Sequence, residues 1–248
     1  MGWVDSHCHL QLDDRDPALL LDRATEVDWV VVPGVDAKSS RAALELADRF
    51  PDRVIATAGL HPHEASSWAK QESAIEHLAL RAAAVGETGL DFYRNLAPRD
   101  DQVRCFEDQL RLAIALEKPV VIHCRDAFAE VYEIIEREGI GSDAILHCWT
   151  GGRRWTRRFL SLGCWFSFAG PVAFKTGETI RLAAELVPPE RALLETDTPY
   201  LAPPPHRHEQ NEPAFVSLIG EVLARIWSLP VDQVATQTAA NAALVFGR

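Results

Sequence analysis

Short runs of β-branched and other apolar residues alternate with longer amphipathic segments along the chain, and this alternation constrains the fold more than any other feature. Eight such runs predict strands, because each is short, apolar and followed by a helix-like pattern. The expected strands are 3–5, 29–32, 54–58, 83–86, 120–123, 144–147, 165–168 and 192–194. The expected helices are 17–26, 37–50, 72–82, 99–117, 126–138, 152–162, 177–186 and 213–227, with a last one at 231–245. Apolar strands that alternate with helices are typical of a parallel sheet covered by helices.

Eight strand–helix units in 248 residues predict a TIM (β/α)8 barrel. An open, doubly wound parallel sheet is the alternative, but the sequence has neither of the glycine-rich phosphate-binding motifs of nucleotide-binding folds. We therefore expect no nucleotide cofactor. Because the sequence shows no internal repeat, low-complexity segment or linker, we treat residues 1–248 as one domain.

The formal net charge of −11 excludes a general attraction to nucleic acids or anionic membranes. A polyanionic substrate would therefore be held by local positive charge or by metal ions. The sequence has no apolar run near the roughly 20 residues of a membrane span, and no basic-then-apolar N-terminal signal. Its five cysteines form no C-x-x-C motif, which indicates reduced thiols. We expect a cytoplasmic monomer without membrane association.

Six of the expected strands end in or are followed by His, Asp or Glu residues. In a barrel the carboxyl ends of all strands meet at one rim, and active sites are built there. We therefore expect these side chains to form one site at that rim. The segments that carry them are 5–9, 59–63, 87–91, 123–125, 147–149 and 195–197.

His7 and His9 are two residues apart on one strand, so both imidazoles face the same side and can reach one cation. Imidazole and carboxylate donors suit a hydrolytic divalent ion such as Zn²⁺ or Mn²⁺. Six donors exceed the need of one tetrahedral ion and suffice for two ions bridged by a carboxylate, for which Glu87 is the candidate. Side-chain alternation directs the neighbouring cysteines, Cys8, Cys124 and Cys148, to the opposite side as packing residues. The six expected donors are His7, His9, Glu87, His123, His147 and Asp197.

Several motifs follow one another in a recognisable order. They are D-S-H-C-H-L at 5–10, G-L-H-P at 59–62, V-G-E-T-G-L-D at 85–91, P-V-V-I-H at 119–123, H-C-W-T-G at 147–151 and E-T-D-T-P-Y-L at 195–201. With these motifs, from about residue 3 to 247, the chain resembles the TatD family of metal-dependent hydrolases, one of the amidohydrolase-like barrels.

The resemblance implies one divalent ion on His7, His9, Glu87 and Asp197. It implies a second ion on Glu87, His123 and His147, with Glu87 standing where related barrels have a modified lysine. Family members resemble 3′→5′ exonucleases or other DNA hydrolases, and some are linked to removal of mischarged D-amino acids from tRNA. We therefore expect a phosphodiesterase or deoxyribonuclease that acts on single-stranded DNA ends with two divalent ions. Zn²⁺, Mn²⁺, Mg²⁺ and Ni²⁺ are all compatible with these donors.

Two other functions stay open at this point. A metal-dependent deacylase or amidohydrolase, acting on a small molecule or on D-aminoacyl-tRNA, would use the same ions. A non-enzymatic barrel with a relic metal site is disfavoured, because no ligand position is missing. For either enzyme, Glu87 and Asp197 are the expected catalytic residues. Asp197 would orient and deprotonate the attacking water, although it could instead cap a helix.

The expected substrate-binding residues are His61 and Arg125. His61 would donate to a phosphate oxygen, or else cap its own loop. Arg125 would bind a phosphate in a bidentate manner, or else form an ion pair with Asp91 or Asp126. We expect Asp91 to orient a metal ligand and His63 to have a structural or supporting role.

The chain departs from the family pattern at two places. Trp149 and Thr150 replace the usual Phe and Ser after the sixth strand, and Gln210 replaces the usual Arg before Asn-Glu-Pro. Loss of that arginine removes one anion contact, which Arg207, His206 or His208 could replace. Separately, 153–158 is an arginine-rich cluster around Trp155, which is either a nucleic-acid contact or a solvated helix face paired with glutamates.

Overall fold

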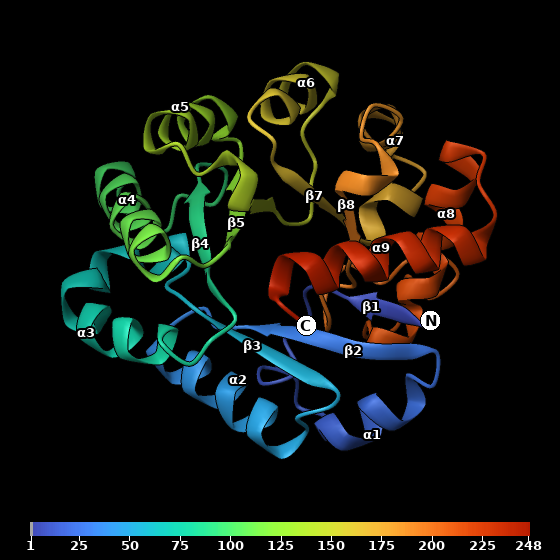
Figure 1. The fold of residues 1–248 in the computed structure, drawn as a ribbon, viewed down its shortest axis with the longest axis horizontal. Coiled ribbons are helices and arrows are strands. Elements are labelled where there is room, and N and C mark those ends of the chain that lie inside the picture. The colour runs from blue at the N-terminus through green and yellow to red at the C-terminus, as the bar shows by residue number, and fades with distance from the viewer. Residues whose placement is uncertain (1) are drawn as a thin grey trace.

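Eight parallel strands form a nearly closed barrel in the computed structural model, which describes residues 2–248 (Figure 1). Neighbouring strands pair in sequence order from β1 to β8. Between β8 and β1 the chain is joined by the amide of Ser6, which donates to the carbonyl of Leu194 at 2.8 Å. The expected TIM barrel is confirmed. The strands are β1 (Trp3–Asp5), β2 (Val27–Pro33), β3 (Val54–Ala58), β4 (Ala84–Asp91), β5 (Val120–Arg125), β6 (Ala144–Leu146), β7 (Trp165–Phe168) and β8 (Ala192–Leu194).

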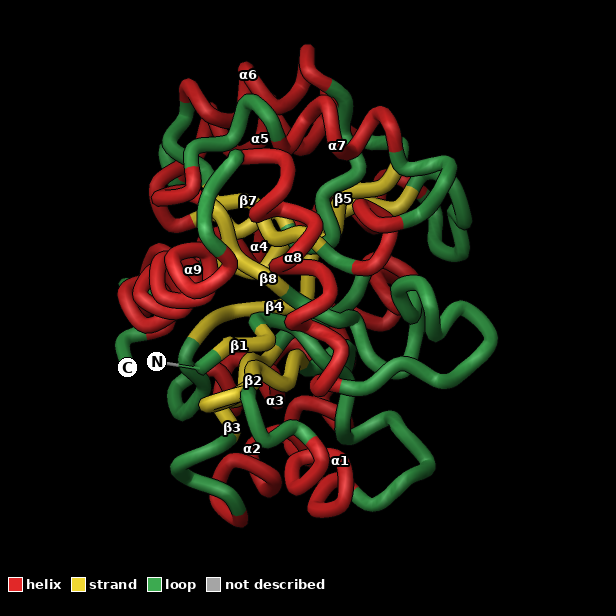
Figure 2. The backbone as a smooth tube through the Cα atoms, turned by 90° about the vertical axis from the view of Figure 1, so that its right-hand side faces the viewer, coloured by secondary structure: helices red, strands yellow, loops and turns green. Residues whose placement is uncertain are grey.

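Helices surround the strands as an outer ring (Figures 1 and 2). Their apolar faces pack on the outside of the sheet, as the sequence periodicity predicts. Several ends follow local signals; α2, for example, begins after Asp36, whose carboxylate accepts from the amide of Ser39 at 2.6 Å. The helices are α1 (Pro17–Arg23), α2 (Ala37–Arg49), α3 (Trp68–Ala79), α4 (Arg99–Leu116), α5 (Phe128–Glu138), α6 (Arg153–Ser161), α7 (Glu178–Ala184), α8 (Val216–Trp227) and α9 (Val231–Phe246).

The helix α9 closes the amino-terminal end of the barrel. It packs with Phe246 against Trp29, and Asn241 donates to the carbonyls of Pro189 and Ala192 at 2.7 and 2.8 Å. Figure 2 shows α9 on one side of the strands and long loops on the other. One end of the barrel is therefore filled by apolar packing, and the other end is left for polar residues.

Three strands extend further than the sequence predicted, and one of them is β2, which was expected over 29–32 and spans Val27–Pro33. We expected strands over 83–86 and 120–123, but β4 continues to Asp91 and β5 to Arg125. Glu87 consequently lies within β4 and not after it, and His123 lies inside β5 and not at its end. The positive φ of Gly86 and Gly89 allows β4 to continue in a distorted register, which a count of alternating residues does not detect.

Other boundaries moved by a few residues. The helix expected at 72–82 begins at Trp68 and ends at Ala79, and the one expected at 213–227 begins with a 3-10 turn over Pro213–Phe215. Within residues 2–248, no single helix is long and apolar enough to cross a membrane; Pro213–Trp227 and Val231–Phe246 pass that test only together, across a bend of 110°.

Candidate metal centre

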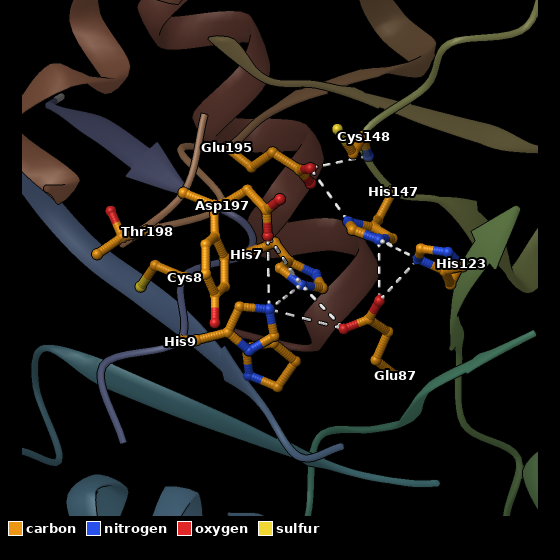
Figure 3. A network of polar contacts seen from close by, with 12 residues as sticks. His7, Cys8, His9, Glu87, His123, His147, Cys148, Glu195, Asp197 and Thr198 are labelled. Carbon is orange, nitrogen blue, oxygen red and sulfur yellow. Dashed lines mark hydrogen bonds and ion pairs between the residues drawn. The ribbon is translucent and has the colours of Figure 1, made fainter. Parts of the chain in front are cut away.

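A pocket of about 680 Å³ opens at the carboxyl ends of the strands. All eight strand ends face this side of the barrel, so residues far apart in sequence meet there. Five of the six expected donors line the pocket and the sixth, His7, lies directly beneath it against Glu87. Figure 3 shows the six side chains pointing toward one another.

The first group of donors comes from the segments that follow β1 and β8 at the seam of the barrel, and from β4. The expected placement of His7 and His9 on one strand was wrong, because β1 ends at Asp5. The Nε2 atoms of His7 and His9 lie 3.2 Å apart. They are 3.3 and 3.7 Å from Oε2 of Glu87, and 3.8 and 3.4 Å from Oδ1 of Asp197. Both histidine nitrogens therefore lie within 3.8 Å of a carboxylate oxygen of Glu87 and of Asp197.

The second group lies on the other side of Glu87. Its Oε1 atom is 3.1 Å from Nδ1 of His123 and 3.0 Å from Nε2 of His147. The two ring nitrogens are 3.3 Å apart. Figure 3 shows the Glu87 carboxylate between the two groups of imidazoles. One carboxylate thus presents each of its oxygens to a different set of donors.

These distances fit divalent cations. A tetrahedral ion with ligand bonds of about 2.1 Å separates its ligands by about 3.4 Å. The donor atoms in each group lie 3.0 to 3.8 Å apart. Nitrogen and carboxylate oxygen without thiolate is the donor set that hydrolytic Zn²⁺ and related ions use. The residues present therefore fit two bridged ions.

The protonation states also suit a cation site. Burial disfavours the charged form of Glu87, but the surrounding imidazoles outweigh burial and hold the pKa of this carboxyl well below its usual range. Burial likewise disfavours a charged His147, yet the carboxylates of Glu87 and Glu195 raise its pKa. The pocket thus concentrates negative charge that needs positive partners, which are protons or metal ions.

Both histidines of the second group are oriented by a further carboxylate. His123 contacts Oδ2 of Asp91 through Nε2 at 3.1 Å, and His147 contacts Oε1 of Glu195 through Nδ1 at 3.2 Å. Asp91 was expected to orient a ligand, and this contact is present. The role of Glu195 was missed, although its place two residues before Asp197 puts both on one strand end. Such partners fix the ring and its tautomer.

His61 lies above the second group, with Nε2 3.4 Å from Oε1 of Glu87. Burial lowers its pKa to about 4, so the ring is neutral at neutral pH. Its Nδ1 accepts from the amide of His63 at 3.2 Å, and the ring proton therefore sits on Nε2. The contact with His63 is the loop cap that the sequence offered as the alternative role of His61. Its Nε2–H group lies against Glu87 at the pocket, and donation to a substrate stays a prediction.

Arg125 lines the pocket, and its guanidinium stacks on the ring of Tyr93 at 4.0 Å. Neither Asp91 nor Asp126 forms an ion pair with it in the part of the chain that the structure describes. Arg94, which the sequence reasoning did not consider, lines the same pocket. Both cations come from the side of the pocket that carries His123, since Arg125 ends β5 and Arg94 follows β4.

The expected orientation of the cysteines was only partly right. Cys8 does point away, since its Sγ lies 3.6 Å from the carbonyl oxygen of Val31. Cys124 and Cys148, however, line the pocket. Side chains do not alternate between the two faces at Cys148, because β6 ends at Leu146 and Cys148 has a positive φ of 44°. Burial raises the pKa of both thiols, so they are uncharged at neutral pH.

The arginine-rich cluster 153–158 lies outside the pocket on α6. Arg153 pairs with Glu185 at 3.2 Å, and Arg158 stacks on Tyr132 at 4.1 Å. The pair with Glu185 favours the second interpretation of this cluster, a solvated helix face paired with glutamates. The proposed substitute for the missing loop arginine, Arg207, stacks on Phe174 at 3.6 Å.

Comparison with known proteins gives consistent matches. A family model described as TatD-related DNase matches residues 4–247. The chain is 37% identical over 246 residues to the 3′-5′ ssDNA/RNA exonuclease TatD of Erwinia amylovora, with 94% of each chain covered. It is 33% identical over 254 residues to the uncharacterized metal-dependent hydrolase YabD of Bacillus subtilis, with 98% of each covered. The solved structure of YjjV, a TatD homologue from Escherichia coli, shares the fold with a TM-score of 0.90 at 24% identity, over 99% of this chain and 98% of that one.

Proposed function

This chain belongs to the TatD-related DNase family of metal-dependent hydrolases, and from that premise we propose that it removes nucleotides from the 3′ ends of single-stranded DNA. The relative named as a 3′-5′ ssDNA/RNA exonuclease supports this substrate class. We also propose that the centre holds two divalent ions. His7, His9, Glu87 and Asp197 would hold one, and Glu87, His123 and His147 the other.

The observation that carries the proposal is the position of Glu87. A buried carboxylate that faces donors with both oxygens has the arrangement of a bridging ligand, and a two-ion clamp suits phosphodiester hydrolysis. Zn²⁺, Mn²⁺, Mg²⁺ and Ni²⁺ all accept these donors.

Different residues of the chain would accept the proton and bind the phosphate. When bound, the two ions would acidify a water molecule and neutralise charge on the phosphate. Asp197 reaches the pocket, and although burial opposes its ionisation, His9 and His7 lower its pKa. Its carboxylate is therefore ionised and able to accept a proton from water. His61 would donate to a phosphate oxygen, and Arg125 at the end of β5 would hold the phosphate.

We further propose that the enzyme acts as a monomer in the cytoplasm. All the donors come from one chain, and all five cysteines are free thiols. A reducing compartment maintains such thiols.

The test combines metal analysis with turnover. We expect purified protein to bind two equivalents of divalent metal and to shorten 5′-labelled single-stranded DNA stepwise, with activity lost on chelation and restored by metal. Glu87→Ala and His123→Ala should abolish hydrolysis while the circular dichroism spectrum stays native. Glu64→Ala, which removes a carboxylate from the pocket rim, is the matched control and should stay active.

A fully active Glu87→Ala enzyme would refute the bridge. Turnover of D-aminoacyl-tRNA or a small amide in place of DNA would establish the deacylase alternative, because that reaction uses the same donors.

A further inference from the structure

Large, exposed apolar side chains lie at the mouth of the pocket, around its polar metal centre. Leu12, Leu96 and Tyr200 are 45%, 66% and 55% exposed, and all three line the pocket. Large apolar groups are normally exposed singly and without pattern. A set of them around a metal centre indicates a ligand that carries apolar surface as well as charge.

Two of these side chains follow a donor of the first group at the same spacing along the chain. Leu12 lies three residues after His9 and donates its amide to the His9 carbonyl at 2.9 Å. Tyr200 lies three residues after Asp197 and donates its amide to the Asp197 carbonyl, also at 2.9 Å. Each donor is therefore followed by a tight turn that places an apolar side chain at the rim.

The backbone at Tyr200 is held rigidly. The buried Asn211 donates from Nδ2 to the carbonyls of Tyr200 and Thr196, at 2.6 and 2.7 Å. Its own amide donates to the carbonyl of Pro199 at 3.1 Å. The Tyr200 ring stands 6.2 Å from the ring of His9, at an angle of 66°. An aromatic ring with a fixed backbone and an open face is a preorganised surface for stacking.

The cationic residues of the mouth lie on the opposite wall. Leu12 and Tyr200 follow β1 and β8, which meet at the seam, whereas Arg94 and Arg125 belong to β4, β5 and the loop after β4. In an eight-stranded ring these two pairs of strands lie half a turn apart. Arg94 and Arg125 thus form a cationic wall on the β4–β5 side of the mouth, where Leu96 also lies, and Leu12 and Tyr200 face it from the seam. The cations on one side and the apolar side chains across from them suit the phosphate and base sides of a nucleotide strand.

We propose that Leu12 and Tyr200 form a base-stacking subsite for one of the two nucleosides joined by the scissile phosphodiester. This inference rests on the proposed function and specifies how its substrate is recognised. Stacking accepts any base but requires that the base be unpaired. The subsite therefore selects single-stranded ends without reading their sequence.

The test compares oligonucleotides that carry normal bases with oligonucleotides that carry a tetrahydrofuran abasic residue at the last or the penultimate 3′ position. For the unaltered enzyme we expect kcat/KM to fall about tenfold when the base at one of these positions is missing. Tyr200→Ala should show a similar fall on the normal oligonucleotide and almost none on that abasic one. Tyr200→Phe keeps the ring and should behave as the unaltered enzyme.

Leu12→Ala should raise KM for the normal oligonucleotide in the same way, whereas Leu80→Ala, which truncates a leucine that is 60% exposed away from the pocket, should not. Equal kcat/KM of the unaltered enzyme on normal and abasic substrates overturns the subsite and leaves the exonuclease function standing. Equal losses for Tyr200→Ala on both substrates also overturn it. Absence of turnover on every oligonucleotide overturns the function and the subsite together.

Discussion

Asp91 and Glu195 each contact the ring nitrogen that a second-group histidine turns away from Glu87, in His123 and His147 respectively. Asp91 also contacts Nε2 of His63 at 3.0 Å. Replacing either carboxylate by its amide removes a negative partner and frees the ring to change tautomer. We expect Asp91→Asn and Glu195→Gln each to weaken metal binding at the second group by about 10- to 100-fold. Affinity at the first group should change little.

Competitive titration with a metal-sensitive chelating dye measures both affinities. Asp13→Asn is the matched control, since Asp13 pairs with Arg15 outside the centre. If both affinities fall together in Asp91→Asn and Glu195→Gln, the two groups do not act as separate sites.

Asp5 is a fully buried carboxyl that accepts hydrogen bonds from the amide and hydroxyl of Thr196, at 2.9 and 2.6 Å. Burial raises its pKa to about 8, from an ordinary value of 3.8. The folded state therefore keeps a proton that the unfolded state has already lost between these values. The contribution of Asp5 to the free energy of unfolding is fully present below pH 4 and is lost as the pH rises toward 8.

We expect metal-free protein to lose up to about 1.4 kcal/mol of unfolding free energy per pH unit in this window, relative to Asp5→Asn. Urea denaturation of both proteins between pH 5 and 8 measures the difference. Parallel stability curves would show that Asp5 stays ionised in the fold.

Residue types and their place at strand ends were enough to predict the donor set that the structure brings together. His7 and His9 meet as expected although both lie after β1, and Glu87 stood out as the shared carboxylate. What the sequence did not reveal was the environment of each ring. The tautomer of His61 depends on an amide two residues later, and the role of Glu195 depends on His147, which is 48 residues away.

The pairing of β4 with β5 determines where Glu87 and His123 lie. A Cβ atom at Gly89, where φ is 134°, would collide with the carbonyl oxygen of His123. Gly89→Ala should therefore destabilise the protein by more than about 1 kcal/mol and displace His123 from the second group. Gly139→Ala is the control, because Gly139 also has a positive φ but no atom within 4 Å of its Cβ position.

Urea denaturation and metal stoichiometry check this prediction. Gly139→Ala should retain the full metal content with a modest loss of stability. Gly89→Ala with a normal metal content would mean that the second group tolerates a shift of β5.

At the level of elements, the alternation of strands and helices predicted the order and type of every strand. The predicted boundaries of β4 and β5 were wrong where the backbone departs from regular strand geometry. The strand over Ala84–Asp91 contains Gly86 and Gly89, and its register with β5 shifts between Val85 and Thr88. Local pattern cannot show that such a strand continues, because the hydrogen bonds that extend it come from residues more than 30 positions away.

At the scale of the whole molecule, a net charge of −11 opposes the approach of a polyanion. Binding of the nucleic acid must then depend on a few cationic side chains near the pocket. The binding constant should therefore change only weakly with salt concentration. Each phosphate contact on a single strand contributes about −0.7 to the slope of log binding constant against log salt concentration. Removing one such contact should reduce the slope by that amount.

We expect Arg125→Ser to flatten the salt dependence of KM by about 0.7 and to raise KM at low salt. An Arg153→Ser, Arg158→Ser double variant should leave the slope unchanged, because Arg153 pairs with Glu185 and Arg158 stacks on Tyr132, both away from the pocket. Steady-state kinetics between low and physiological salt measures both slopes. If the double variant flattens the slope while Arg125→Ser does not, the strand runs over α6, and the cationic wall of the mouth is not its phosphate contact.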